Sequence, residues 1–258
     1  MKSVSNHGFK LATASLLAIS ALGAMLAPAT ASAAIVAGTA TITIDNTALS
    51  TSSINVGGGY PNGWFVDKFW DATYNTSGID VSAPGGVVVS HTGSTAMSFN
   101  VNTNASTISY PSAGTYGRTV QATSMDASNT SSGQIGLSGG WLLVSPGGSG
   151  VLTPYDFSLT KTGSTWNIRT FDTAFSFQNF LKLTNVSESL NGSGQLLLSG
   201  DLQWTGLWAG LVGANTNTVV GHFSLAPAAV PVPAAVWMFA SGLLGLLGVS
   251  RKKSVVAA

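Results

Sequence analysis

The sequence predicts an all-β exported domain, an antiparallel β-sandwich in type, flanked by an N-terminal signal peptide and a C-terminal transmembrane helix. Three observations carry this prediction. Uncharged apolar segments stand at both ends of the chain, short runs of alternating β-branched residues fill the region between them, and turn-forming Gly, Pro and Asn separate the runs. Helical patterns that would connect parallel strands are missing between these runs, which favours antiparallel pairing.

The first element, residues 1–33, is typical of a secretory signal peptide. Two lysines precede an uncharged apolar run over residues 11–27, and the small residues of Ala31-Ser32-Ala33 follow it. We expect signal peptidase to cut between Ala33 and Ala34. An uncleaved membrane anchor is the alternative, which the well-formed cleavage site disfavours.

The composition of the exported region, residues 34–226, limits its function. Through residue 229 it carries nine acidic and five basic side chains, a formal balance of −4, so nothing attracts nucleic acid. The sequence has no cysteine, so stability must come from buried apolar area and hydrogen bonds. Since only 7% of the chain is charged, Ser, Thr, Asn and Gly must cover its surface, as suits an exported protein.

Alternation of apolar and polar residues predicts the strands. Residues 39–44 and 97–101 alternate clearly, while residues 86–91 contain three consecutive valines. Further strands are expected at residues 141–144, 157–159, 166–169, 171–177, 181–183, 195–204 and 219–225. The side chains expected to face the core are Ile42, Ile44, Val88, Phe99, Leu143, Phe157, Ile168, Phe175, Phe177, Leu198, Leu202 and Phe223.

Turn signals separate most of these strands. Asn191-Gly192 suits a two-residue hairpin because both residues tolerate positive φ. A β-solenoid is the alternative architecture, but the sequence shows no fixed repeat period. Residues 102–133 are rich in Ser, Thr, Ala, Asn and Gly. This composition predicts either a long loop with weak strands or a sheet edge that carries additional loop segments. Residues 63–74 fit a short amphipathic helix and a strand equally well.

Aromatic and polar side chains interleave over residues 60–75, a pattern that suggests a carbohydrate site. Aromatic rings stack on the C–H face of a sugar, and carboxylates or amides bind its hydroxyl groups. The candidate glycan-binding residues are Tyr60, Trp64, Asp67, Trp70, Asp71 and Tyr74. We favour the alternative, that these rings fill the core, because large rings bury the most area and large exposed apolar patches are rare. The same two interpretations apply to Trp204 and Trp208.

Signals for catalysis are weak. Residues 136–140 match the string of a serine-hydrolase nucleophile elbow around Ser138, but a strand rather than a helix is expected to follow. His91 and His222 lack metal-ligand spacing. Glu188 is the only glutamate, so a paired carboxylic acid site does not stand out. We therefore expect no enzymatic activity, no cofactor and no metal.

A second apolar segment, residues 233–249, is followed by three consecutive basic residues, Arg251 to Lys253. As a helix it would span about 25 Å, a little less than the roughly 30 Å hydrocarbon core, which the bilayer accommodates by thinning slightly. Basic residues favour the cytoplasmic side. We therefore expect a transmembrane helix at about residues 233–250, a body on the opposite side of the membrane from the basic cluster, and a short tail at residues 254–258.

The residues of this segment also form a recognisable motif. Pro231-Val232-Pro233-Ala234-Ala235-Val236-Trp237 precedes Ser241-Gly242-Leu243-Leu244-Gly245-Leu246, and the basic cluster follows. The motif, which covers about the last 25 residues, resembles the PEP-CTERM protein-sorting domain, although Val232 stands where the family's name-giving glutamate would be. The resemblance implies sorting by an exosortase, an integral-membrane cysteine peptidase of Gram-negative bacteria that usually make exopolysaccharide. The residues implicated by the resemblance are Pro231, Pro233, Ala234, Ala235, Trp237, Arg251, Lys252 and Lys253.

Together these features predict a protein of the cell envelope or exopolysaccharide matrix, with residues 227–253 as its sorting signal and a structural or adhesive role. Exosortase, signal peptidase and exopolysaccharide are the expected partners. A permanent single-span anchor without processing is the alternative for the tail. A carbohydrate-binding module that uses the aromatic cluster from Tyr60 to Tyr74 is the alternative for the body.

Overall fold

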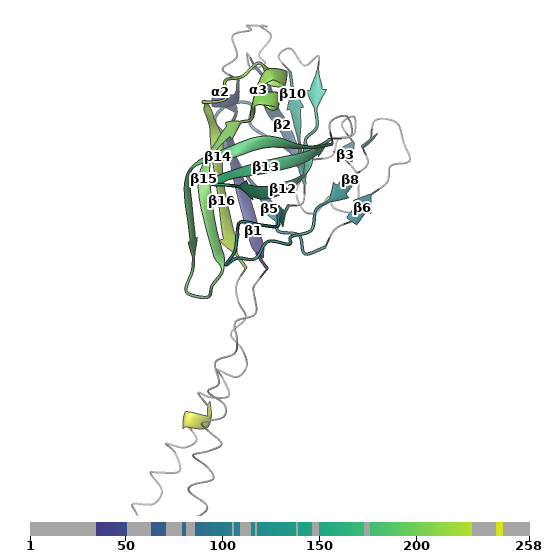
Figure 1. The fold of residues 1–258 in the computed structure, drawn as a ribbon. Helices are drawn as coiled ribbons and strands as arrows, with labels where there is room; N and C mark the ends of the chain where they lie inside the picture. The colour runs from purple at the N-terminus through teal and green to yellow at the C-terminus, as the bar shows by residue number, and fades with distance from the viewer. Residues whose placement is uncertain are drawn as a thin grey trace, which may run out of the picture. The chain divides into compact units, whose positions relative to one another are not determined.

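The computed structural model describes residues 35–50, 63–70, 79–80, 86–104, 106–108, 115–116, 118–137, 139–145, 150–172, 176–228 and 241–244. These residues form mostly antiparallel β-structure, which confirms the predicted all-β class (Figure 1). The predicted signal peptide and its cleavage site lie outside the described residues. So does most of the predicted sorting segment, residues 227–253, of which only residues 227–228, at and after the end of the last strand, and residues 241–244, which are helical, are described. Within the described parts of the chain, no helix is long and apolar enough to cross a bilayer.

One large sheet, curled into a half-barrel, makes up most of the body, where the sequence had suggested the two stacked sheets of a sandwich (Figure 1). Its ten principal strands are, in spatial order, β4 (Val87–Val88), β2 (Phe65–Trp70), β10 (Gly140–Val144), β12 (Tyr155–Thr162), β13 (Thr165–Asp172), β14 (Ser176–Leu190), β15 (Leu196–Trp204), β16 (Val219–Pro227), β1 (Gly38–Asp45) and β5 (Ser94–Asn100).

Shorter elements complete the described fold. β11 (Val151–Leu152) pairs with β10, and β9 (Ile135–Gly136) pairs with β12. Two small separate sheets join β3 (Ile79–Asp80) to β7 (Thr115–Tyr116) and β6 (Ser106–Ile108) to β8 (Arg118–Val120). The two short helices, α2 (Asn46–Leu49) and α3 (Gly206–Val212), follow the ends of β1 and β15.

The core lies against the inner face of the curled sheet, and the period of two along each strand determines which side chains reach it. In β1, Ala40, Ile42 and Ile44 are fully buried, while the threonines between them point to the outer face. Nine of the twelve predicted core residues are buried, which confirms them: Ile42, Ile44, Phe99, Leu143, Phe157, Ile168, Leu198, Leu202 and Phe223.

The prediction for Val88 is wrong. Its side chain is 69% exposed, and its neighbour Val89 is the buried one. Three consecutive valines contain no alternation, so the pattern could not show which of them faces inward, and β4 is a two-residue strand at the sheet edge. Phe175 lies outside the described residues, and so does the side chain of Phe177.

Residues 65–70 form strand β2, which decides between the helix and the strand that the sequence allowed there. β2 pairs with β10 on one side and with β4 on the other. A register shift opposite Leu142 and Leu143 interrupts the alternation, so that both ends of β2 are buried. This irregularity explains why the sequence shows neither a clean period of two nor a clean helical period.

The buried side chain of Asn46 forms hydrogen bonds between the two ends of the curled sheet. Asn46 follows β1, yet its Nδ2 donates to the carbonyl oxygen of Val66 in β2 at 2.9 Å and its Oδ1 accepts from the Val66 N–H at 2.9 Å. Nδ2 also donates to the Ser90 carbonyl at 2.6 Å. The amide thus reproduces the pairing that a neighbouring strand would give Val66, and it is fully buried.

Candidate functional site

Of the six candidate carbohydrate-binding residues, the structure describes Trp64, Asp67 and Trp70. Trp70 is 1% exposed, and Phe65 and Phe69, the other rings of β2, are also buried. Trp64 is half-buried and packs against the core. Tyr60, Asp71 and Tyr74 lie outside the described residues. A ring packed on both faces cannot stack on a sugar, so Trp70 is a core residue, in line with the alternative that the sequence favoured.

The second aromatic pair is also part of the core. Trp204 and Trp208 are both fully buried and pack edge-to-face on Phe180, with ring centroids 5.4 and 4.7 Å from its ring. Phe180 continues the cluster to Trp141 and Phe157. These contacts explain the tryptophan content of the chain as packing, since edge-to-face pairs add to the stabilisation that burial itself provides.

Both histidines of the exported region contact an aspartate. His91 Nε2 lies 2.9 Å from Asp67 Oδ1, and His222 Nδ1 lies 3.3 Å from Asp201 Oδ1. Hydrogen bonds from Asn185 and His222 lower the pKa of Asp201 below its ordinary value. In the described part of the chain, no three side chains of His, Asp or Glu come close enough together to hold a metal ion.

The glycine-rich string around Ser138 has a packing role in the structure. Ser138 itself is not described, but β10 begins at Gly140, so a strand follows where a nucleophile elbow requires a helix. Gly139 has φ +116°, and a Cβ there would lie 2.1 Å from the Trp70 carbonyl oxygen. The absence of a side chain at Gly139 therefore lets its backbone approach the backbone of Trp70 closely beside the core.

The carboxylate of Glu188, near the end of β14, accepts several hydrogen bonds from other described elements. It accepts hydrogen bonds from Lys161 Nζ at 2.7 and 3.0 Å, from Thr130 Oγ1 at 2.6 Å and from the indole Nε1 of Trp166 at 2.9 Å. Lys161 Nζ also lies 5.6 Å from the Trp166 ring centroid. Because Thr130 belongs to the loop that places Met125 in the core, the cluster ties this loop to β12, β13 and β14.

The electrostatics of Glu188 fit a structural role. Burial raises the pKa of the Glu188 carboxyl. The hydrogen bonds from Lys161, Thr130 and Trp166, together with the charge of Lys161, lower the pKa by more than burial raises it, so it lies below its ordinary value of 4.5. All these partners stabilise the ionised Glu188 carboxylate relative to the protonated carboxyl group. The cluster therefore stabilises the folded state above the ordinary pKa, and this contribution is lost as the pH falls through the lowered pKa.

We expect Glu188→Gln to lower the free energy of unfolding at pH 7 by about 1 kcal/mol, the size typical of a partly exposed, hydrogen-bonded ion pair. Urea denaturation at a series of pH values checks this. The wild type should lose stability between about pH 5 and 3, and the variant should lose less over this range. Thr130→Ala removes one of the hydrogen bonds that lower the Glu188 pKa but keeps the ion pair and the Trp166 hydrogen bond, so it should lose only part of the pH dependence. Parallel curves for Glu188→Gln and the wild type would contradict this role.

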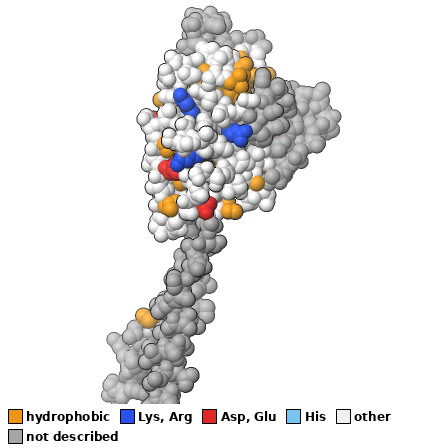
Figure 2. All heavy atoms as spheres, in the orientation of Figure 1, with side chains coloured by type: hydrophobic (Ala, Val, Ile, Leu, Met, Phe, Trp, Pro, Cys, Tyr) orange, Lys and Arg blue, Asp and Glu red, His pale blue; other side chains and the backbone are white. Residues whose placement is uncertain are grey.

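The outer face of the sheet carries rows of small polar side chains. Cross-strand pairing aligns one hydroxyl residue from each of five adjacent strands: Ser187, Ser199, Ser224, Thr41 and Ser98. The face shown in Figure 2 is correspondingly poor in charged groups. These hydroxyl groups can both donate and accept hydrogen bonds, so the surface is hydrophilic without being strongly charged.

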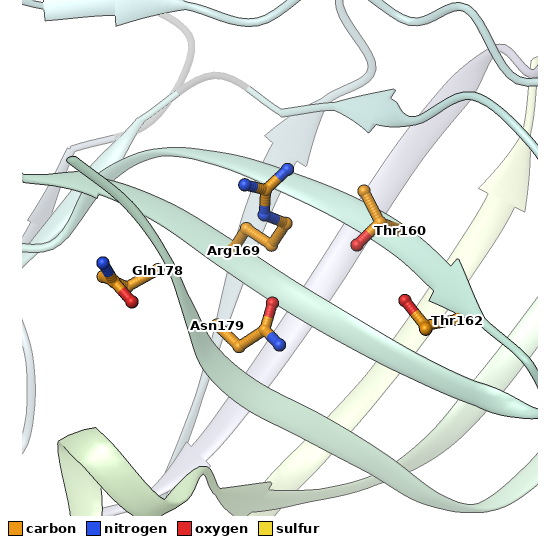
Figure 3. Close-up of a pocket in the computed structure, with 5 residues that line it drawn as sticks. All are labelled: Thr160, Thr162, Arg169, Gln178 and Asn179. Atoms are coloured by element: carbon orange, nitrogen blue, oxygen red, sulfur yellow. The ribbon is translucent and has the colours of Figure 1, made fainter.

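A shallow hollow of about 410 Å³ lies on β12, β13 and β14, and no motif in the sequence indicates it. Figure 3 shows the five side chains that line it, from three adjacent strands. They are Thr160, Thr162, Arg169, Gln178 and Asn179. The hollow is open to solvent, and every side chain that lines it is polar.

A β-bulge shapes this hollow. The pairing of β13 with β14 shifts between Ile168 and Arg169, so Arg169 lies opposite Asn179 and both Phe180 and Leu181 are buried. The hydroxyl of Thr205 donates to the carbonyl oxygens of Asn179 and Phe180. The bulge thus changes which residues of β14 face outward, and no sequence period indicates such a shift.

No family model, curated protein or solved structure matches the chain.

Proposed function

We propose that the protein is an exported component of the cell envelope or exopolysaccharide matrix, sorted by an exosortase, with a structural or adhesive role and no catalytic activity. In this proposal, residues 1–33 are a signal peptide that signal peptidase removes, and residues 227–253 are the sorting signal. A transmembrane helix at about residues 233–250 holds the intermediate in the inner membrane. The body then lies in the periplasm before it reaches the surface or matrix.

The observation that carries the proposal is the segment from Pro231 to Lys253, in which a proline motif, an apolar run and a basic stop follow one another. Basic residues at this end favour a cytoplasmic C-terminus, and a signal peptide delivers the rest of the chain to the opposite side.

The geometry of the body supports this arrangement. Gly38 pairs with Pro227, and the N–H of Ala228 donates to the carbonyl oxygen of Ala37 at 3.2 Å. Figure 1 shows that β1 begins and β16 ends at the same end of the sheet, opposite α2 and α3. The chain therefore enters and leaves the body side by side. A tether at this end leaves the opposite end and the polar outer face of the sheet accessible to a matrix.

The proposal is tested by mass spectrometry of the mature protein from its native host. We expect an N-terminus at Ala34 and a C-terminus upstream of Arg251, because processing removes both targeting segments. A mature chain that still ends at Ala258 would show a permanent anchor instead. Turnover of an ester or glycoside substrate by the purified protein would contradict the non-catalytic role.

Deletion of residues 234–253 should release the body in soluble form with its stability unchanged. The reason is that the sheet ends at Pro227, and all the buried apolar residues of the described body precede that position. Cell fractionation should move the protein from the membrane to the soluble fraction, and urea denaturation should give the same midpoint as the full chain. Loss of cooperative unfolding in this variant would show that the body depends on its tail.

A further inference from the structure

We infer that the end of the body from which the tail leaves lies against the lipid bilayer while the tail anchors the protein, and that Leu190 and Leu197 of the β14–β15 hairpin contact the headgroup layer. The inference rests on the proposed membrane-held intermediate and adds the surface by which the body meets the membrane. We call this end of the body the base. Its described segments are residues 35–38, 189–197 and 226–228.

Pairing and hydrogen bonds join the three segments of the base. Gly38 pairs with Pro227 across β1 and β16. Gln195, in the turn between β14 and β15, donates from Nε2 to the carbonyl oxygen of Ala228 at 2.8 Å. Figure 1 shows that the β14–β15 hairpin turns at the same end of the sheet at which β1 begins and β16 ends. The hairpin turn therefore lies beside the residue from which the chain continues toward the tail.

The short stretch of chain between the base and the tail limits how far the base can lie from the membrane. Five residue steps separate Ala228 from Pro233, where the transmembrane helix is expected to begin. Fully extended, five residues span at most about 17 Å, at roughly 3.4 Å per residue. The headgroup layer fills about 5–7 Å of this distance, half the difference between a bilayer of about 40–45 Å and its hydrocarbon core of about 30 Å. The base is therefore held close to the headgroups.

The side chains of the base suit contact with lipid. Its three segments contain no charged residue, so no ionised group of these segments has to leave water when the base meets the membrane. Ile35 is 59% exposed, Leu190 is 47% exposed and Leu197 is 38% exposed. Apolar side chains on a surface are stabilised when they move from water into the boundary between headgroups and acyl chains.

The charged groups beside the base argue against an electrostatic contact. Asp126 forms a β-bridge with Ile35, and the carboxylate of Glu188, just before the hairpin segment, binds Lys161. The three segments of the base contain no lysine or arginine that could bind a lipid phosphate group. The contact is therefore apolar, and we expect it to form on neutral lipid and to be insensitive to salt.

Exposed leucines alone do not identify the base, because Leu207 and Leu211 on α3, at the opposite end, are 46% and 38% exposed. The base differs from that end in its short connection to the anchor. A short linker gives an effective concentration on the order of millimolar, so a contact too weak to hold a free protein still forms when the tail is anchored. The same weakness lets the body leave the membrane once the tail is removed.

The test measures fluorescence quenching by nitroxide groups attached to lipid. Because the chain has no cysteine, one introduced cysteine can carry a dye at a chosen site. Ser193→Cys places the dye in the exposed hairpin turn, and Asn217→Cys places the control dye at the exposed position just before β16 begins. The tail-bearing protein is purified from membranes and reconstituted in phosphatidylcholine vesicles. We expect the hairpin dye to be quenched at least about twofold more than the control dye, at low and at high salt.

Two matched variants assign the contact to its side chains. Leu190→Ser combined with Leu197→Ser should lower the quenching of the hairpin dye to the level of the control dye. Leu207→Ser combined with Leu211→Ser makes the same two changes at the opposite end and should leave that quenching unchanged. All four side chains are exposed, so both variants should keep the urea midpoint close to that of the wild type. Deletion of residues 234–253 should abolish quenching, because the contact depends on the tether.

Four results would overturn the inference: equal quenching of the two dyes, full quenching of the hairpin dye in the variant of the hairpin leucines, quenching of the tail-deleted body, or loss of quenching at high salt. Flotation of the vesicles distinguishes this failure from failure of the proposed function. A protein that floats with the vesicles while its hairpin dye stays unquenched contradicts only the contact of the base. A tail-bearing protein that does not float contradicts the anchored intermediate and the inference with it.

Discussion

Asn46→Ala is expected to lower the free energy of unfolding by roughly 3–5 kcal/mol, a large part of the 5–15 kcal/mol typical of a domain. The substitution removes two buried hydrogen bonds, to the N–H and carbonyl of Val66, and one partly buried hydrogen bond, to the carbonyl of Ser90. Each buried polar group left unpaired costs about 1–3 kcal/mol. Urea denaturation of the purified protein measures the loss.

The matched control for this prediction is Asn104→Ala. Asn104 is exposed, and its side chain donates to its own neighbour, Thr103, at 3.3 Å. The control should therefore change stability by less than about 0.5 kcal/mol. A similar effect of both substitutions would show that Asn46 does not connect the two ends of the sheet.

Pro231→Ala combined with Pro233→Ala should cause an unprocessed precursor that still carries its tail to accumulate in the membrane. Proline fixes φ and lacks an N–H, so we expect the two prolines to keep this segment extended and unpaired outside the bilayer, where a membrane peptidase can bind it. Alanine would let the helix extend through this segment, because alanine is the strongest helix former. The mass of the membrane-bound protein, compared with that of the wild type, checks the prediction.

Membrane retention serves as the internal control. The apolar run and the basic cluster from Arg251 to Lys253 remain in the double variant and should still stop translocation. The mass of the membrane-bound protein therefore reports whether a peptidase recognises the prolines, independently of whether the apolar run anchors the chain in the membrane. If the mature mass is the same in variant and wild type, with the tail present in both, the segment is a simple anchor.

Much of the sheet could be predicted from the sequence because regular strands repeat every two residues. In β1, β15 and β16 the alternation of apolar and polar side chains is nearly unbroken, and the predicted inward residues Ile42, Leu202 and Phe223 are fully buried. The prediction of inward-facing residues failed where the two-residue alternation of the strands is interrupted. The run of valines at Val88 gave the wrong residue, and the bulge that exposes Asn179 opposite Arg169 left no pattern to read.

The all-β class and the regular core positions could be predicted from the sequence alone, because both depend on residues close together in the chain. Only the tertiary structure decided that the strands form one curled sheet, that Trp70 packs in the core and that Asn46 pairs with Val66 twenty positions away. It also brought Arg169 beside Thr160 and Asn179, which come from two neighbouring strands. Such contacts depend on strand order and register, and local sequence does not determine which strands become neighbours when a sheet curls.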